Sequence, residues 1–386
     1  MSHPTTLESR RWLVLASALV SFFAVGVTFF AVPPLVPLLR ELFALSNLQA
    51  GLLMGAIAFP AIILSIPLGL AVDRWDPRST GLAGLALMAL GGALFAYAPG
   101  YAFLIGGRLV FGVGALALNL LLARLITTAF AGRELGLAMG LFTGAYPASM
   151  IVLFSLHPTL VKALGWRGEL AAIAALAFLA MPLHALAVPR RATVTSGTPA
   201  PPGRAHEILS RPLVALGAAW MLFFAAHAST LTFAAEWVGG ERALLTVSVI
   251  TWAGLVLTPL AGAAIDRRGR PELWCAGALV LMALTLAAMA LGVAPLAAML
   301  ALGVAASVVV PAVYSLPGRL VAPARVGLAF GFITALSNFG TVAGPAAAGA
   351  LRDATPAWPP LWLALAGIVA LGALLAPLAA AGRSRQ

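Results

Sequence analysis

The chain has 386 residues, of which 62% are hydrophobic and only 9% are charged, and its mean hydropathy is +1.02. Soluble domains carry roughly 25% charged residues, so this composition excludes a water-soluble globular protein and predicts an all-α integral membrane protein. The net charge of +11 does not indicate a nucleic-acid partner, because the basic residues lie between apolar runs, where they set membrane orientation.

Apolar runs long enough to cross a bilayer recur along the whole chain. A helix needs roughly 20 apolar residues to span the hydrocarbon core. The first run follows Arg10 and Arg11 and is too long for a cleavable signal, so we expect it to remain in the mature protein. Charged residues and turn signals divide the sequence into twelve predicted transmembrane helices, at about 12–38, 48–72, 80–98, 102–128, 135–160, 168–188, 212–236, 243–265, 272–291, 294–318, 326–350 and 358–380.

The longest polar stretch lies between the sixth and seventh runs and is rich in Pro, Gly, Ser and Thr. It predicts a flexible linker at residues 189–211 between an N-terminal bundle, residues 1–188, and a C-terminal bundle, residues 212–386. Similar segments recur in the same order: FFAVGVT at 22–28 and FFAAHAS at 223–229, then GLAMGLFTGA at 136–145 and GLAFGFITAL at 327–336. The repeat predicts two pseudo-symmetric six-helix bundles in parallel orientation.

Basic residues are unevenly divided between the two predicted sides of the membrane. The termini and the loops after the even-numbered helices hold sixteen of them, and the opposite side holds five. The positive-inside rule therefore places both termini and the linker in the cytoplasm. We expect a multi-pass protein of a bacterial inner membrane, with membrane lipid among its partners.

Two charged loops interrupt the apolar pattern at equivalent places in the halves. GLAVDRWDPR at 69–78 and GAAIDRRGR at 262–270 place Asp73 and Asp266 at the same step of the pattern. Both resemble the loop signature G-x-x-x-D-R-x-G-R-R/K of the major facilitator superfamily, although Asp76 and Pro77 depart from it. The resemblance implies secondary transport by alternating access, with a gating motif at Gly69, Asp73, Arg74, Arg78, Gly262, Asp266, Arg267 and Arg270. The alternative is that these are ordinary positive-inside loops.

Arg108 lies within the fourth predicted span, in the segment GRLVFGVG. The segment resembles the superfamily pattern R-x-x-Q-G-x-G, with Phe111 in place of Gln, and this implies proton or substrate-anion handling by Arg108. The alternative is a side chain that snorkels to the interface. Arg124, nearer the cytoplasmic end, has the same two interpretations: it lines the inner cavity or it snorkels.

The fifth span reads GLFTGAYPASM at 140–150. Drug–proton antiporters of the superfamily carry G-x-x-x-G-P-x-x-G-G there. Gly140 and Gly144 fit that pattern, but Pro147 is displaced and the closing glycines are absent. This segment disfavours the drug-antiporter branch.

The predicted spans carry no carboxylate in mid-span, so His227 is the best candidate for a coupled proton, against the alternative of a histidine bonded only to a neighbour. Polar and aromatic side chains at mid-span positions are candidates for substrate contact, although each is also compatible with simple packing. The predicted substrate-binding residues are Arg108, Asn119, Arg124, Tyr146, His227, Tyr314 and Asn338.

The sequence contains no phosphate loop, H-E-x-x-H segment or nucleophile elbow, and its one cysteine, Cys275, excludes a cysteine cluster, so we expect no enzyme, no cofactor and no metal site. The interior arginines favour a small organic or inorganic anion as substrate. The segments GLAMGLF and GLAFGF resemble transporters of small monovalent anions such as cyanate, or of organic acids. A coupled proton or an exchanged anion and a monomeric state are further expectations. The alternatives are an efflux pump for hydrophobic compounds and a non-transporting membrane sensor on the same scaffold.

Overall fold

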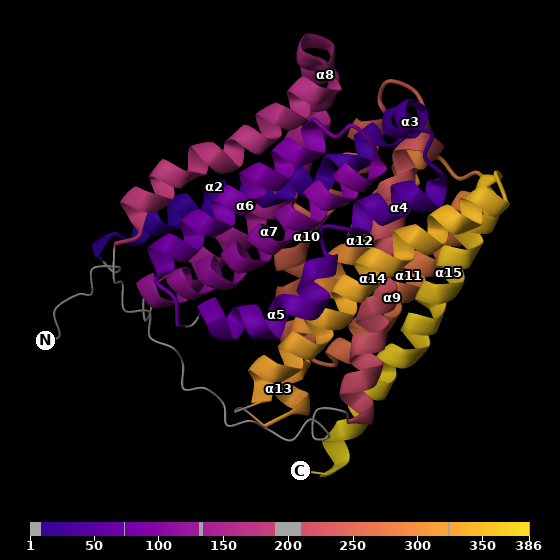
Figure 1. Ribbon diagram of the computed structural model, residues 1–386. Helices are drawn as coiled ribbons and strands as arrows, with labels where there is room; N and C mark the ends of the chain where they lie inside the picture. The colour runs from indigo at the N-terminus through magenta and orange to yellow at the C-terminus, as the bar shows by residue number, and fades with distance from the viewer. Residues whose placement is uncertain (1–8, 73, 131–133, 190–209, 323–324, 386) are drawn as a thin grey trace, which may run out of the picture. The chain divides into compact units, whose positions relative to one another are not determined.

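The computed structural model describes residues 9–72, 74–130, 134–189, 210–322 and 325–385, and all regular structure within these ranges is helical (Figure 1). Eleven of the helical segments are long and apolar enough to cross a membrane. The longest, α8 (Leu135–Ala187), has 53 residues. At 1.5 Å per residue α8 is about 80 Å long, more than twice a hydrocarbon core of about 30 Å. Gly165 breaks α8 with φ 71° and ψ 169°, so α8 supplies two spans and the predicted twelve-helix fold is confirmed.

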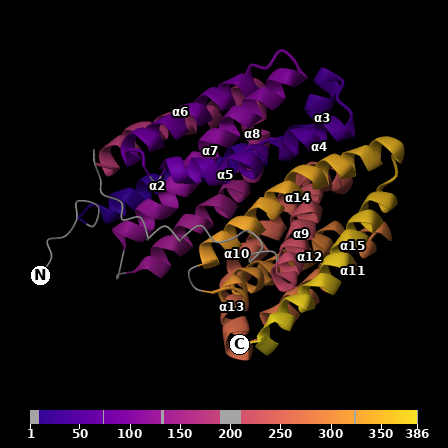
Figure 2. The same cartoon turned by 60° about the horizontal axis from the view of Figure 1, so that its bottom comes forward.

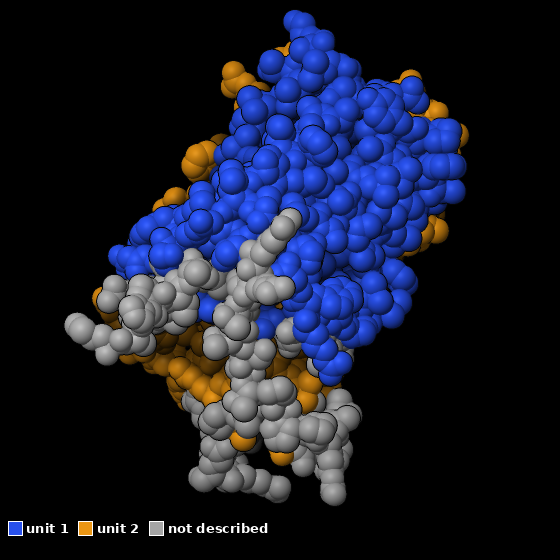
Figure 3. Space-filling model, turned by 60° about the vertical axis from the view of Figure 1, so that its left-hand side comes forward, with its two compact units in different colours: residues 1–35, 56–199 blue, residues 36–55, 200–386 orange. Residues whose placement is uncertain are grey.

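The chain forms two compact units, coloured separately in Figure 3. Unit 1 comprises Met1–Leu35 and Ala56–Pro199, and unit 2 comprises Val36–Gly55 and Ala200–Gln386. Residues 36–55 therefore pack with unit 2, although they precede the linker by more than a hundred residues in the sequence. The division of the chain at residues 189–211 stays a prediction, since residues 190–209 lie outside the described residues.

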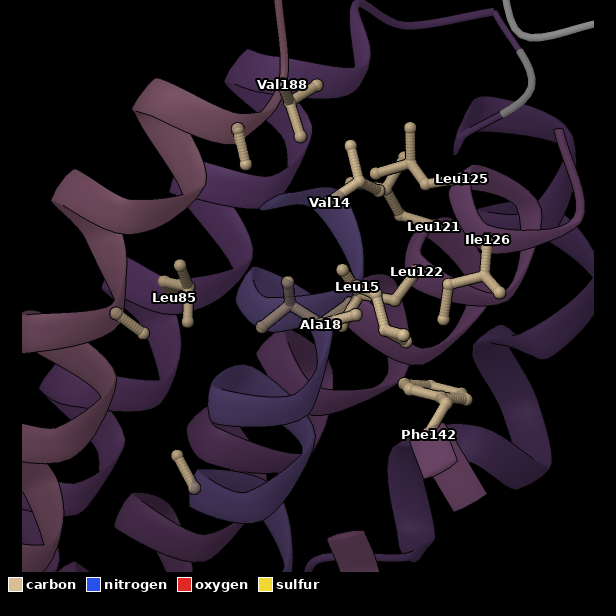
Figure 4. Close-up of a cluster of buried hydrophobic side chains, with 14 of the residues drawn as sticks. Val14, Leu15, Ala18, Leu85, Leu121, Leu122, Leu125, Ile126, Phe142 and Val188 are labelled. Atoms are coloured by element: carbon tan, nitrogen blue, oxygen red, sulfur yellow. The ribbon is translucent and has the colours of Figure 1, made fainter. Parts of the chain in front are cut away.

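Unit 1 is built from α2 (Arg11–Phe30), α5 (Phe59–Val72), α6 (Pro77–Ala96), α7 (Tyr101–Ala129) and α8. α6 packs along α7 and α8, and α2 packs along α8 and α7. Figure 4 shows part of the core, where Val14 and Leu15 of α2 lie beside Leu121 and Leu122 of α7. Lipid tails are as apolar as these side chains, so their fit to one another stabilises the bundle more than their removal from water does.

Glycines bring α6 and α7 together at backbone distance. A Cβ added at Gly91 would overlap the backbone of Phe111, and one added at Gly114 would overlap the backbone of Gly84. Small residues at a helix interface allow this close approach, which increases dispersion contacts in a membrane.

Prolines break the first two predicted spans. The predicted span 12–38 is interrupted at Ala31, between α2 and α3 (Val32–Phe43), and the predicted span 48–72 is interrupted at residues 56–58, between α4 (Asn47–Gly55) and α5. Pro33, Pro34 and Pro60 have no N–H to donate to the preceding turn. Each of these two predicted spans is therefore made of two helical segments with a break between them.

Unit 2 contains α4 and the C-terminal part of α3, followed by α9 (Arg211–Val238), α10 (Ala243–Arg268), α11 (Pro271–Ala290), α12 (Pro295–Tyr314), α13 (Pro317–Leu320), α14 (Val326–Ala354), α15 (Trp358–Leu375) and the 3-10 helix η3 (Ala376–Arg385). α11 and α15 run side by side in Figures 1 and 2, and α9 packs along α14. Gly340 and Gly344 permit the α9–α14 contact, because an added Cβ at either would overlap the backbone of Met221 or Ala225.

Candidate functional site

The two charged loops form corners between consecutive helices. In the second copy, Gly269 (φ 67°) ends α10 and donates its N–H to the Ile265 carbonyl at 2.8 Å, Arg270 also has a positive φ of 58°, and Pro271 starts α11. The positive φ of Gly269 explains why the signature requires glycine there. Of the gating residues in this copy, Asp266, Arg267 and Arg270 have exposed side chains, and Gly262 is half-buried.

The first copy departs from the signature because its second helix begins one residue earlier. Asp76 is the N-cap of α6 and accepts a hydrogen bond from the Ser79 N–H at 2.9 Å, while Pro77 occupies the first helical position. Both residue types are favoured at those positions. Gly69 and Arg78 are half-buried and Arg74 is exposed; Asp73 lies outside the described residues.

Arg108 is buried in unit 1, with 1% of its surface exposed. Its Nη1 donates to the Thr28 carbonyl at 2.6 Å, and its Nη2 lies 3.5 Å from the Phe29 carbonyl. Phe29 is four residues before Pro33, which has no N–H, so its carbonyl has no helical donor. The guanidinium therefore binds the negative end of α2.

Tyr146 meets the same end of α2. The Tyr146 ring lies 5.8 Å from the Phe29 ring, 5.1 Å from the Phe30 ring and 5.6 Å from the Phe22 ring. The structure thus brings together two predicted site residues, Arg108 and Tyr146, that are 38 positions apart in the sequence.

The other two predicted site residues of α7 lie apart from this pair. Asn119 is exposed on the helix surface. Arg124 is half-buried, and its Nη1 lies 3.4 Å from the carbonyl of Val72 at the end of α5. Arg124 thus bonds to a helix end, as Arg108 does.

In unit 2, His227 and Tyr314 belong to one connected set of aromatic rings. His227 is half-buried and stacks on Phe223, with ring centroids 5.4 Å apart. Tyr314 is 51% exposed, and its ring contacts Trp220 edge-on at 5.9 Å. Asn338 of α14 is half-buried and donates from its Nδ2 to the Thr334 carbonyl at 2.9 Å.

Sequence reasoning missed two polar clusters. The first joins the two parts of α8: Glu169, 1% exposed, accepts from His157 Nδ1 at 2.8 and 3.0 Å. The twelve-residue separation gives no helical signal, since Gly165 turns the chain between them. Removing one partner of such a buried pair is strongly destabilising.

The second cluster ties residues 36–55 to α9 and α14. The carboxylate of Asp353 accepts from the Asn47 N–H and Nδ2, both at 2.8 Å, and from the Leu48 N–H at 2.9 Å, so it caps α4. Glu236 lies 3.4 Å from Arg40 and 3.7 Å from Arg352. Asp353 and Asn47 are 306 positions apart, and no local pattern links them.

Two cavities in unit 2 are lined by residues other than the predicted substrate-binding ones. One of about 510 Å³ is lined by parts of α10, α11 and α12, including Arg268, Arg270 and Trp274. Another of about 340 Å³ lies among α9, α14 and α15 and has a wholly apolar lining.

Known proteins resemble this chain over most of its length. A sequence profile of the Major Facilitator Superfamily matches residues 18–244 and 239–385. A crystal structure of a bacterial homolog of the human lysosomal transporter Spinster, inward-facing and occupied, superposes with a TM-score of 0.81 at 14% identity. The superposition covers 99% of this chain and 98% of the other, and at that identity it shows the fold alone.

Two relatives with described names match shorter stretches. The transcription regulatory protein OpdE of Pseudomonas aeruginosa is 28% identical over 277 residues, which are 68% of this chain and 67% of that protein. The 2-nitroimidazole transporter of Escherichia coli is 30% identical over 192 residues, 48% of this chain and 46% of that protein. The match thus spans less than half the length of the nitroimidazole transporter.

Proposed function

Because the chain belongs to the major facilitator superfamily, a family of multi-pass secondary transporters, we propose that it moves a small organic or inorganic anion across the bacterial inner membrane by alternating access. The carrying observation is the sign of the charge inside the spans. Arg108 and Arg124 lie within α7. Each carboxylate of the described residues, in contrast, lies in the first or last turn of a helix, at a helix cap or in a loop. Glu169 is included because it lies in the first turn after the break of α8 at Gly165. Charged groups inside spans mark ion and substrate pathways, and a positive interior favours an anion.

The candidate residues take different parts in this proposal. Arg108 attracts the anion through its field, because its guanidinium is buried against the end of α2. Tyr146, His227, Tyr314 and Asn338 supply the polar groups that orient the solute. Asn119 and Arg124 lie toward the predicted cytoplasmic end of α7 and line the path of the solute there.

His227 is the proposed carrier of a coupled proton, because its imidazole is a group within α9 that can bind and release a proton. An exchanged anion is the alternative source of coupling. The chain is proposed to act as a monomer.

Alternating access requires contacts that break and re-form at each end of the molecule. At the predicted outer end, this role is proposed for the Asp353 cap on α4 and the Arg40–Glu236–Arg352 cluster. At the predicted cytoplasmic end, this role is proposed for Asp73 and Asp266, because a carboxylate is stabilised near a helix N-terminus.

A ligand-binding experiment on the purified full-length protein tests the proposal. Cyanate, acetate and the hydrophobic cation tetraphenylphosphonium are compared by thermal shift, because a ligand of the folded state raises the melting temperature. We expect a shift with an anion in the wild type and in Arg242→Gln, an exposed matched control. We expect a smaller shift in Arg108→Gln, which loses the charge but keeps an amide donor. A shift with tetraphenylphosphonium alone, equal in all three proteins, would favour hydrophobic-compound efflux instead.

The second candidate function is a membrane sensor that does not transport. It is favoured by the resemblance to a protein named as a transcription regulator over 68% of this chain. Reconstituted vesicles separate the two functions: uptake of the radiolabelled anion that gives the thermal shift supports transport, whereas binding without uptake supports a sensor.

A further inference from the structure

Unit 2 contains six rings in one connected group, which we call the aromatic ladder. Four come from one face of α9 at spacings of three and four residues, and α12 and α14 supply one each. The ladder consists of Trp220, Phe223, Phe224, His227, Tyr314 and Phe330.

The rings contact one another without a gap from α9 to α14. Trp220 stacks on Phe223 at 5.3 Å and meets Tyr314 at 5.9 Å, and Tyr314 stacks on Phe330 at 5.6 Å. At the other end of the ladder, Phe223 stacks on His227. Centroid distances of 4.5–7 Å are those of favourable aromatic pairs.

One edge of the ladder is buried and the other is open. Trp220 and Phe223 are 3% and 2% exposed and form the buried edge, whereas Phe224, His227 and Phe330 are half-buried and Tyr314 is exposed. Packing within unit 2 is enough to explain the positions of the Trp220 and Phe223 rings. The others present ring surface that this unit does not cover.

Two polar groups on the open edge have no hydrogen-bond partner among the residues that the structure describes. Neither the imidazole of His227 nor the hydroxyl of Tyr314 forms a hydrogen bond with any residue that the structure describes. Polar groups inside a membrane protein are costly without a partner, so a ligand or water is expected there.

We propose that the open edge of the aromatic ladder binds the ring of an aromatic substrate, while His227 and Tyr314 bind its polar group. The inference rests on the proposed function for the charge of this substrate, which is then an aromatic carboxylate. The ring itself is inferred from the ladder, because stacked and edge-to-face rings attract one another beyond their buried area. A saturated ring of the same size gains burial but lacks this attraction.

Three probes test the inference by isothermal titration calorimetry on the purified full-length protein. Benzoate and cyclohexanecarboxylate share charge and approximate size but differ in aromaticity, and benzyl alcohol keeps the ring without the charge. We expect benzoate to bind about fivefold to tenfold tighter than cyclohexanecarboxylate, as one or two aromatic contacts provide. Tyr314→Leu is expected to abolish this preference, and Tyr314→Phe, which keeps the ring, to retain it. Phe103→Leu, at an exposed aromatic of unit 1, is the matched control and is expected to leave the preference unchanged.

The outcomes separate this inference from the proposed function. Equal affinities for benzoate and cyclohexanecarboxylate would overturn the aromatic substrate and leave anion transport standing. Benzyl alcohol binding as tightly as benzoate, with Tyr314→Leu weakening both, would support the ladder as a ring site and overturn the anion. If neither benzoate nor benzyl alcohol binds, the inference is overturned. The proposed function is then tested by whether cyclohexanecarboxylate binds.

Discussion

Arg108 donates hydrogen bonds to carbonyl groups at the end of α2, where a proline in the sequence removes a backbone donor. Pro33 removes the N–H that the Phe29 carbonyl at the end of α2 would otherwise meet, and Arg108 supplies an N–H in its place while also donating to the Thr28 carbonyl. A guanidinium suits this position because it is charged, planar and rich in donors. The same side chain thus stabilises the bundle and makes its interior positive.

Replacing Arg108 by alanine is expected to destabilise the protein. The carbonyls of Thr28 and Phe29 would lose their charge-assisted donor, and the Phe29 carbonyl, which Pro33 leaves without a helical donor, would then lack a partner at a cost of about 1–3 kcal/mol. We expect Arg108→Ala to melt below Arg108→Gln, and both below the wild type, in detergent-solubilised thermal denaturation without ligand. Arg242→Ala, at an exposed position, is the control and is expected to stay within about 0.5 kcal/mol of the wild type. Equal melting of Arg108→Ala and the wild type would show that the contact to α2 is not structural.

Sequence patterns predict which residues have an uncommon position for their type. They do not predict which partners these residues contact. A charge within an apolar run identifies Arg108, but its partners lie 80 and 79 positions away on another helix. Asp353 looks like an ordinary charge at a span end, yet it caps α4 through contacts with Asn47 and Leu48. Such contacts depend on which helices become neighbours in the fold, and the hydropathy of the sequence does not encode this.

At the scale of elements, hydropathy predicts the spans because each bilayer crossing demands about 20 apolar residues. It does not predict where a span breaks, because the apolar run continues through Ala31 and through residues 56–58 without a polar signal. Backbone donors decide those positions, and prolines remove them. In α8 two spans follow one another within a single helical segment, and the dihedral angles of Gly165 mark the turn between them.

Gly165 is expected to be required at that turn for its backbone alone. Its φ of 71° and ψ of 169° belong to a region that only glycine adopts readily, and a Cβ there would meet nothing within 4 Å. Gly165→Ala should therefore cost about 1–3 kcal/mol. Gly140→Ala, in the same helix with an equally open surrounding but ordinary helical φ, should be neutral or up to about 1 kcal/mol stabilising. Thermal melting of the pair checks this; a Gly165→Ala protein as stable as Gly140→Ala would mean that the break is not fixed by the backbone.

At the scale of the whole molecule, the repeat predicts two related halves, and the equivalent corners at Asp76 and Gly269 agree with it locally. The units nevertheless do not follow the repeat, because residues 36–55 pack with unit 2. Glycine packing and the Asp353 cap hold that segment on α14: a Cβ at Gly51 would overlap the backbone of Pro345. A sequence repeat describes how a chain arose in two similar parts, whereas packing depends on surface fit between particular helices.

Orientation in the membrane is the property of the whole chain that its charges predict most directly. The predicted cytoplasmic side carries sixteen basic residues against five, so the corner after α10 should face the cytoplasm and the turn within α8 should face outward. Single cysteines introduced by Arg268→Cys and Lys162→Cys, both at exposed positions, test this in a Cys275→Ala background, since Cys275 is the one native cysteine and is buried. A membrane-impermeant maleimide should label the Lys162→Cys protein in intact spheroplasts and the Arg268→Cys protein only after permeabilisation. The reverse order would contradict the orientation, and with it the assignment of the Asp353 contacts to the outer end and of Asp266 to the cytoplasmic end.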